Sequence, residues 1–160
     1  MKKLKLLPAL FLVTVSAINA HTGKQPNEAK TKAIVEQFFG YTSQKDFDKI
    51  PTLFTESIDW YIFESKYMPW TGHRTKSAQL PETIRTLESA FISGIGKLEV
   101  TSFIIKGNEA VVIGTASRTV KTTNKSFTTP FTMHFTLKDG LITKFLMYEE
   151  TLVIEKAFIK

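Results

Sequence analysis

The chain has 160 residues, of which 42% are hydrophobic and 13 are phenylalanine, enough for one domain with a sizeable core. It contains no cysteine, which excludes disulfides, thiolate metal sites and a cysteine nucleophile. The formal net charge is +6, and the basic residues are dispersed along the chain. We therefore expect no nucleic-acid partner.

Residues 1–20 have the pattern of a secretory signal peptide. Three lysines precede an apolar run from 6 to 15, and the small residues that follow suit cleavage after Ala17 or Ala20. The alternative is an uncleaved membrane anchor, but the apolar run is short for a membrane span and contains Pro8. We expect an exported protein, periplasmic or secreted, that keeps no stable membrane anchor after cleavage. Loss of the three lysines leaves 18 basic against 15 acidic side chains, a net charge of +3.

The first half of the remaining chain predicts three helices. After a polar linker at 21–26, Asn27 can cap a helix that Gly40 would end. A second, short helix begins at Asp46, and a third begins at Ser77. Each carries apolar residues at helical spacing, so each has one face to bury.

Between the second and third helices, the sequence predicts one strand and one loop. Residues 57–63 are rich in aromatic and β-branched side chains and are expected to form a strand. Residues 64–76 contain Pro69, Trp70 and Gly72 and are expected to form a loop.

The C-terminal part predicts four long strands joined by two-residue turns. The strands span residues 97–106, 109–122, 125–138 and 141–155, with turns at Gly107-Asn108, Thr123-Asn124 and Asp139-Gly140. Asn, Asp and Gly suit the positive φ angles of type I′ turns. The order of elements predicts an α+β fold in which three N-terminal helices pack on a strongly curved, mostly antiparallel sheet.

Two-residue turns also predict which side chains share a face of the sheet. One face, which we expect to be concave, would carry Val112, Gly114, Ala116, Arg118, Phe131, Met133, Phe135, Leu146, Tyr148 and Glu150. In this register Arg118, Thr129 and Glu150 form a row across three strands. We expect this row to mark the open end of a pocket.

The opposite face is also largely apolar. It would carry Val100, Ile104, Val111, Ile113, Thr115, Thr132, His134, Phe145 and Met147. A sheet that is apolar on both sides needs cover on both. The helices can cover one side, and we expect a second copy of the chain to cover the other in a homodimer. His134 is interpreted as an interface or core residue on this face.

Four short segments carry a resemblance to a known family. They are residues 46–54 (DFDKIPTLF), 68–72 (MPWTG), 139–142 (DGLI) and 148–151 (YEET). In this order and spacing the chain resembles the nuclear transport factor 2-like superfamily, and within it the SnoaL-like branch, over about residues 27–158. We therefore expect residues 27–160 to form one SnoaL-like domain.

The resemblance implies a cone-shaped fold whose pocket takes a small, mostly apolar molecule. The superfamily includes steroid isomerases, polyketide cyclases, dehydratases and epoxide hydrolases. The general-base Asp of the steroid isomerases corresponds to Ile62 or Phe63, and their helix Tyr to Phe38, so that chemistry is not expected. SnoaL-like proteins often have an acid near the end of the last strand, which Glu150 matches. The hydrolases pair acids with an Arg, as Arg118 would pair with Glu150.

The predicted ligand pocket contains Tyr61, Trp70, His73, Arg118, Tyr148 and Glu150. In it, Arg118 would orient a bound carbonyl and Glu150 would act as a base, although the two could equally form a structural ion pair. The pattern leaves open which residues of the first strand point inward, so Tyr61 is the weakest member. The three histidines fall on a tail, a loop and the outer face, and no cofactor or metal site is expected.

Two functions remain open. In one, the domain binds a small apolar molecule and performs isomerase, lyase or hydrolase chemistry by acid–base catalysis. In the other, the cone is filled by Phe and Met side chains, and the domain is a non-catalytic binding or assembly module. The volume of the cavity distinguishes the two, since pockets for drug-sized ligands hold at least roughly 300 Å3.

Overall fold

The computed structural model describes residues 26–160, so the predicted signal peptide and nearly all of the predicted linker lie outside the described residues. The elements, in order, are helix α1 (Pro26–Gln44), a 3-10 segment η1 (Phe47–Leu53), strands β1 (Phe54–Ile62) and β2 (Gly72–Lys76), a 3-10 turn η2 (Ser77–Gln79), helix α2 (Leu80–Ser89), strands β3 (Phe91–Lys106), β4 (Glu109–Val120), β5 (Ser126–Lys138) and β6 (Leu141–Glu149), and helix α3 (Thr151–Phe158). The α+β class is as predicted.

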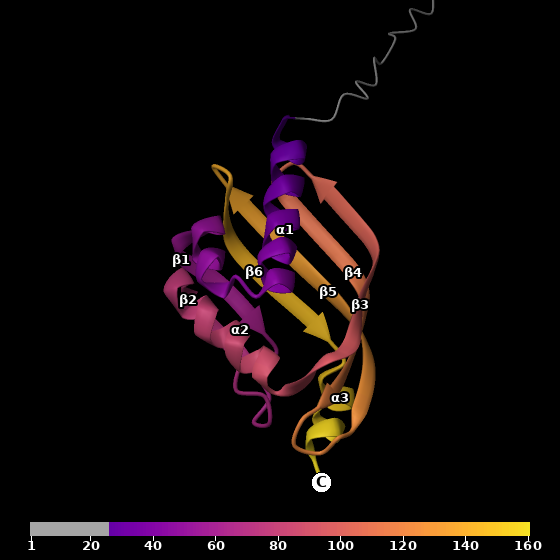
Figure 1. Cartoon of the computed structure of the whole chain (residues 1–160). Coiled ribbons are helices and arrows are strands. Elements are labelled where there is room, and N and C mark those ends of the chain that lie inside the picture. The colour runs from indigo at the N-terminus through magenta and orange to yellow at the C-terminus, as the bar shows by residue number, and fades with distance from the viewer. Residues whose placement is uncertain (1–25) are drawn as a thin grey trace, which may run out of the picture.

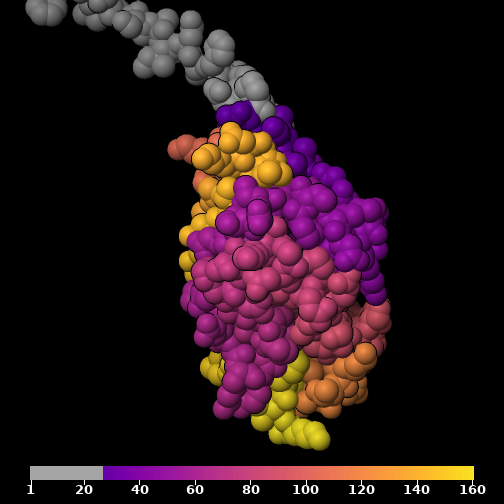
Figure 2. Space-filling view, turned by 90° about the vertical axis from the view of Figure 1, so that its left-hand side faces the viewer, coloured from indigo at the N-terminus to yellow at the C-terminus, as the bar shows by residue number. Residues whose placement is uncertain are grey.

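One sheet of six strands, in the order β2-β1-β6-β5-β4-β3, is the frame of the molecule. Only β1 and β6 pair in parallel; the other neighbours are antiparallel. Helix α1 lies across one face of the curved sheet, and α3 lies at the far end beside β4 and β5 (Figure 1). Seen from the side, the segments from η1 to α2 form a continuous surface in magenta and pink (Figure 2). On the same side of the molecule, η1 contacts both α1 and α2.

The N-terminal part has fewer helices than predicted. Within residues 26–160, α1 and the 3-10 segment η1 precede the first strand, so the second predicted helix is only a 3-10 segment. Helix α2 follows the first strand, as the third predicted helix does. Helix α3 instead occupies residues predicted as the end of the last strand. Helix α1 also continues through Gly40, because one glycine costs a packed helix only about 1 kcal/mol. The residue with a left-handed φ after this helix is Lys45, at 61°. None of the helices within residues 26–160 is long and apolar enough to cross a membrane.

Strand β2 was predicted as part of a loop. Its sequence, Gly-His-Arg-Thr-Lys, lacks apolar alternation because it is an edge strand that pairs only with β1. Charged side chains on an edge strand discourage pairing with other chains. The sequence of such a strand carries little signal, since its extended conformation depends on pairing with the neighbouring strand β1.

Two of the three predicted turns are correct. Lys106 pairs with Glu109, and Lys138 pairs with Leu141 across a turn in which Asp139 and Gly140 have φ angles of 53° and 81°. The β4–β5 connection is longer than predicted, because Thr119 pairs with Ser126. This moves β5 by two residues, which keeps every side chain on its predicted face.

A bulge in β6 changes the face of the strand that follows. Lys138 pairs with Leu141 and Leu137 with Ile142, but Thr136 pairs with Lys144, so Thr143 is an extra residue. One inserted residue reverses the alternation of side chains. Phe145, Met147 and Glu149 therefore lie on the concave face, and Leu146 and Tyr148 lie on the convex face, the opposite of the prediction.

A second bulge in β3 has the same effect on a smaller scale. Val100 pairs with Gly114 but Ser102 pairs with Ile113, which leaves Thr101 unpaired in the ladder. Val100 was predicted on the convex face and instead shares the concave parity of Gly114. Ile104, beyond the bulge, is on the convex face as predicted and pairs with Val111.

The core fills most of the space between α1 and the sheet. The largest side chains with almost no exposure include Phe131, Phe135, Ile50, Ile62 and Met68. The apolar side chains of α1 are buried at helical spacing against the aromatic residues of the sheet, as the periodicity predicted.

Candidate functional site

A cavity of about 150 Å3 remains inside the cone, between α1, α2, α3 and the concave face of the sheet. Its wall is mostly apolar and draws on nearly every element of the domain. The residues that line it are Phe38, Phe39, Thr42, Trp60, Ile62, Met68, Trp70, Ile84, Leu87, Glu88, Phe91, Leu98, Ala116, Arg118, Phe127, Thr129, Met133, Phe145, Met147, Glu149 and Ile154. Three of these side chains are ionisable: Glu88, Arg118 and Glu149.

Aromatic rings form one side of the cavity. The Trp60 indole stacks on Phe145, with ring centroids 3.9 Å apart and planes at 21°. Phe38 meets Trp60 and Phe145 with centroids 6.3 and 6.1 Å away. Within residues 26–160 the buried Trp60 Nε1 has no hydrogen-bond partner. A buried unpaired N–H costs about 1–3 kcal/mol, so packing of the rings must outweigh it.

Glu149 is one of two acids on the cavity wall, the other being Glu88. The Thr143 bulge turns this last residue of β6 inward, where it pairs with Phe131 of β5. Burial among apolar side chains raises the pKa of Glu149 to about 7, because a low-dielectric surrounding disfavours the charged carboxylate. A carboxyl group with this pKa is present in both protonation states near neutral pH.

Arg118 and Glu88 form a two-pronged ion pair at the cavity wall. Arg118 Nη2 donates to Glu88 Oε1 at 2.9 Å and Nη1 donates to Oε2 at 3.2 Å. The guanidinium also lies over the Phe91 ring, 5.5 Å from its centroid. Each of the two charged side chains is 30% exposed, so the pair is partly shielded from water. The prediction that Arg118 pairs with Glu150 is wrong, because its partner is Glu88 of α2.

Of the six predicted pocket residues, the structure places Trp70 and Arg118 on the cavity wall. Trp70 is 3% exposed and packs against Phe91 and Phe158, with ring centroids 5.7 Å away in each case. Met68 of the same loop also lines the cavity, so this loop forms part of the wall.

Glu150 and Tyr148 do not lie in the cavity, which corrects the prediction. Tyr148 is 47% exposed on the convex face because the Thr143 bulge reverses the strand. Glu150 is exposed and lies beyond the end of β6, at the start of α3. Its backbone N–H donates to the Thr129 hydroxyl at 3.0 Å. Thr129 pairs with Ala116, however, and Arg118 pairs with Phe127, so the predicted row of Arg118, Thr129 and Glu150 does not form.

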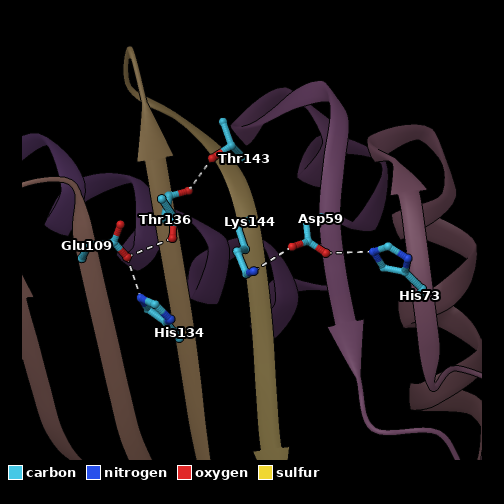
Figure 3. A network of polar contacts seen from close by, with 7 residues as sticks. All are labelled: Asp59, His73, Glu109, His134, Thr136, Thr143 and Lys144. Atoms are coloured by element: carbon cyan, nitrogen blue, oxygen red, sulfur yellow. Dashed lines mark hydrogen bonds and ion pairs between the residues drawn. The ribbon is translucent and has the colours of Figure 1, made fainter.

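Tyr61 and His73 also lie outside the cavity, on the convex side of β1 and β2. Trp60 and Ile62 point into the cone, so Tyr61 points away from it. His73 Nε2 is 2.8 Å from Asp59 Oδ1, and Lys144 Nζ is 2.8 Å from Asp59 Oδ2 (Figure 3). These contacts make His73 part of a surface network.

A second polar cluster lies on the same convex face. His134 Nε2 is 2.5 Å from Glu109 Oε2, and the Thr136 hydroxyl donates to the same oxygen at 2.9 Å (Figure 3). His134 is thus on the predicted face. Among residues 26–160, no three His or acidic side chains converge as a metal site would require.

Sequence reasoning missed Glu149 by one position. The pair Glu149-Glu150 at the end of the last strand was the correct signal, and strict alternation from the Asp139-Gly140 turn selected the wrong member. Glu88 was missed because its partner is in another element. No local pattern predicts an ion pair between α2 and β4.

The conical cavity and curved sheet define a small α+β domain of the NTF2-like kind, and comparison with known proteins agrees. The family described as SnoaL-like domain matches residues 35–145. The chain belongs to this family. Among curated proteins, none matches the sequence.

Solved structures share the fold at low sequence identity. An NTF2-like protein from Burkholderia xenovorans LB400 is 22% identical, with a TM-score of 0.71 over 82% of this chain and 98% of that chain. A protein from Jannaschia sp. CCS1, assigned provisionally as a SnoaL-like polyketide cyclase, is 14% identical, with a TM-score of 0.72 over 85% and 96%. TerC, co-crystallised with polyporic acid, is 18% identical, with a TM-score of 0.69 over 81% and 98%. At these identities the likeness concerns the fold alone.

Proposed function

We propose that the domain binds a small, mostly apolar molecule in the cavity and that Glu149 exchanges a proton with it. The observation that carries this proposal is the Glu149 carboxyl group, which lines a mostly apolar cavity and whose pKa burial raises to about 7. General acids and bases work best when their pKa lies near the working pH. Glu149 meets that condition, whereas the exposed Glu150 is not on the cavity wall.

The size of the cavity limits the ligand. Its volume of about 150 Å3 is half of the lower limit of roughly 300 Å3 for drug-sized pockets. An apolar cavity of roughly 150 Å3 can hold a molecule the size of benzene. We therefore expect a ligand with one ring or a short branched chain, or the end of a longer molecule.

The reaction class follows from the groups available. Glu149 in its ionised form can take a proton from a carbon next to a carbonyl group, and Arg118 has N–H groups that can polarise the carbonyl oxygen. This is proton-transfer chemistry of the isomerase or lyase type; activation of water by the same carboxylate would give a hydrolase. The provisional assignment of one neighbour as a polyketide cyclase, and the crystal of another with polyporic acid, support a role of this kind.

Hydrogen–deuterium exchange into a small cyclic ketone tests the proposal. In D2O, the protein should accelerate exchange at the carbons next to the carbonyl of cyclohexanone, measured by NMR. Glu149→Gln should lose the acceleration by about a hundredfold or more, since general base catalysis contributes at least this much. Glu150→Gln is the matched control and should keep it. No acceleration by the wild type, or equal rates in the two variants, would contradict the catalytic role.

The second candidate is a non-catalytic binding or assembly module. The observation that favours it is the same small volume, together with the nearly complete burial of large aromatic side chains such as Phe131 and Phe135 in the core. Binding of small apolar molecules without proton exchange would support a binding module. If the protein shows neither ligand binding nor proton exchange, the assembly module is the function that remains.

We also propose a homodimer through the convex face. Exposed apolar side chains on this face include Ile104 at 55%, Tyr148 at 47% and Phe63 at 41%. Covering them with the same face of a second copy would remove them from water. Sedimentation analysis should show a dimer that Tyr148→Asp weakens; a monomer at high concentration would contradict it.

Export is proposed from the pattern of residues 1–20. Expression of the full chain in a bacterium should yield a shortened protein outside the cytoplasm. Its N-terminal sequence should start after Ala17 or Ala20. A cytoplasmic product that retains Met1 would contradict export.

A further inference from the structure

A second hollow of about 250 Å3 adjoins the cavity on the side of α2 and the start of β3. Four residues line both spaces: Glu88, Phe91, Leu98 and Arg118. The hollow is more polar than the cavity and more open to solvent. The Arg118–Glu88 ion pair therefore lies at the boundary between an apolar inner space and a polar outer one.

A wide bulge at the start of β3 creates the outer hollow. Phe91 pairs with Val120 and Gly96 pairs with Arg118, so residues 92–95 leave the ladder. Gly96 has a φ of 149°, and a Cβ there would lie 2.7 Å from the Ser117 carbonyl oxygen, so only glycine lets the two strands approach this closely. The bulge is tied to the end of α1 by a hydrogen bond from Lys45 Nζ to Ser93 Oγ at 3.4 Å.

Positive charge dominates the lining of the outer hollow. Arg118, Lys45 and Lys97 line it together with one acid, Glu88. Lys97 also pairs with Glu99, which does not line the hollow. In the Arg118–Glu88 pair, two N–H groups of the guanidinium donate to the two oxygens of one carboxylate, so Arg118 can bind a carboxylate at this boundary.

We infer that cavity and hollow together bind a small aromatic or alicyclic carboxylate, with the ring inside the cavity and the carboxylate at Arg118. In the unliganded protein, Glu88 occupies the position of the ligand carboxylate. This inference rests on the proposed function, because it requires that the cavity take an apolar group.

The physical balance of the exchange favours binding. Replacing the Glu88 carboxylate by that of a ligand leaves the number of hydrogen bonds to Arg118 unchanged. Glu88 sits near the C-terminal end of α2 and is 30% exposed, so it can turn toward water when displaced. The ligand gains burial of its ring and attraction to Lys45. An uncharged ring compound has only the first of these gains.

The test compares acids with their amides of the same shape. Toluene, benzoate, benzamide, phenylacetate and phenylacetamide are titrated into the protein at about pH 6, where these acids are ionised and Glu149 is mostly protonated. The two tryptophans of the chain, Trp60 and Trp70, both line the cavity, so their fluorescence reports occupancy. At least one acid should bind about tenfold more tightly than its amide, as expected for charge-assisted hydrogen bonds.

Variants locate the carboxylate. Arg118→Met should remove the preference for the acid by about tenfold while toluene binding persists, and Glu88→Gln should strengthen acid binding. Lys45→Met should weaken acid binding less than Arg118→Met does. Because it keeps the Arg118–Glu88 ion pair, it tests the site even if Arg118→Met destabilises the protein. Arg85→Met on the outer side of α2, where Arg85 pairs with Asp48, is the control and should change nothing.

Two outcomes separate this inference from the proposed function. If toluene binds but the acids bind no more tightly than their amides, the carboxylate site is overturned and the apolar cavity stands. An acid preference that survives Arg118→Met and Lys45→Met also overturns the site. If no compound binds, the proposed function and this inference both fail.

Discussion

The two faces of the sheet treat acidic side chains in opposite ways. On the concave face, Glu149 lies among apolar side chains, and burial raises its pKa to about 7. On the convex face, a hydrogen bond from Lys144, and to a smaller extent one with His73, holds the pKa of Asp59 below its usual value of 3.8. These residues lie on adjacent strands, β6 and β1, which pair directly.

The difference shows that the side of the sheet, rather than the residue type, decides what a carboxylate can do. A paired surface carboxylate stays ionised and contributes to a network at the surface. A buried one without a cation can hold or release a proton near neutral pH. Because the bulge at Thr143 decides which residues of β6 face inward, it also decides which acid has this property.

The largest expected effect contrasts a concave and a convex aromatic residue. Phe131 is 1% exposed and Tyr148 is 47% exposed. Phe131→Ala should lower the free energy of unfolding by about 3–5 kcal/mol, because it leaves a cavity in the core. Tyr148→Ala should cost the monomer less than about 1 kcal/mol. Urea unfolding followed by tryptophan fluorescence measures both, at a protein concentration low enough to exclude the proposed dimer. Comparable losses would then mean that Tyr148 is buried within the monomer and the β6 register is incorrect.

Glu149→Gln should remove a pH dependence of stability. The folded-state pKa of about 7 lies above the ordinary 4.5, so the folded protein retains this proton more strongly than the unfolded chain. Stability from this group is present below about pH 4.5 and is lost as pH rises through about 7. At about pH 8 the variant should therefore be more stable than the wild type by on the order of 3 kcal/mol.

The measurement is the difference in unfolding free energy between wild type and Glu149→Gln across this pH range. Other titrating groups cancel in the difference. The same series with Glu150→Gln should be nearly flat. Equal pH slopes for the wild type and Glu149→Gln would show that Glu149 has an ordinary pKa.

Gly114 tests how closely β3 and Phe131 approach the concave side of β4. A Cβ at this position would lie 2.1 Å from the Glu99 carbonyl oxygen and 2.7 Å from the Phe131 ring. Gly114→Ala should destabilise the fold by about 1–3 kcal/mol through overpacking. Gly40→Ala, where nothing lies within 4 Å of the new Cβ, should stabilise α1 by about 0.5–1 kcal/mol. Thermal unfolding separates the two, and a gain in stability for Gly114→Ala would refute the close approach.

The smallest effect belongs to the convex network. The depressed pKa of Asp59 adds stability above the ordinary value of 3.8, and this stability is lost as pH falls. Solvent screening limits the contribution, since the Asp59 side chain is 46% exposed. Asp59→Asn should cost less than about 1 kcal/mol at neutral pH, less in high salt and nothing at low pH. A cost above about 2 kcal/mol at neutral pH would make the network as important as the core.

Much of the architecture could be predicted from local sequence. The turns at Gly107-Asn108 and Asp139-Gly140 were predictable because positive φ angles select few residue types. The apolar periodicity of α1 predicted its buried face correctly. Trp70 was placed near the cavity by the resemblance of its loop to SnoaL-like proteins. These features depend on a few neighbouring residues, so a single sequence contains their signal.

Tertiary structure alone decided which side chains meet in the cavity. The extra residue Thr143 lies just after the β5–β6 turn, and no residue type marks a bulge of this kind. The partnership of Arg118 with Glu88 joins elements thirty residues apart. The sequence by itself determined strands, turns and a belt of aromatic residues, because these follow from local backbone preference and hydrophobic alternation. The pairing of β6 with β5 decided that Glu149 rather than Glu150 faces the cavity, because the inserted residue Thr143 reverses every side chain beyond it.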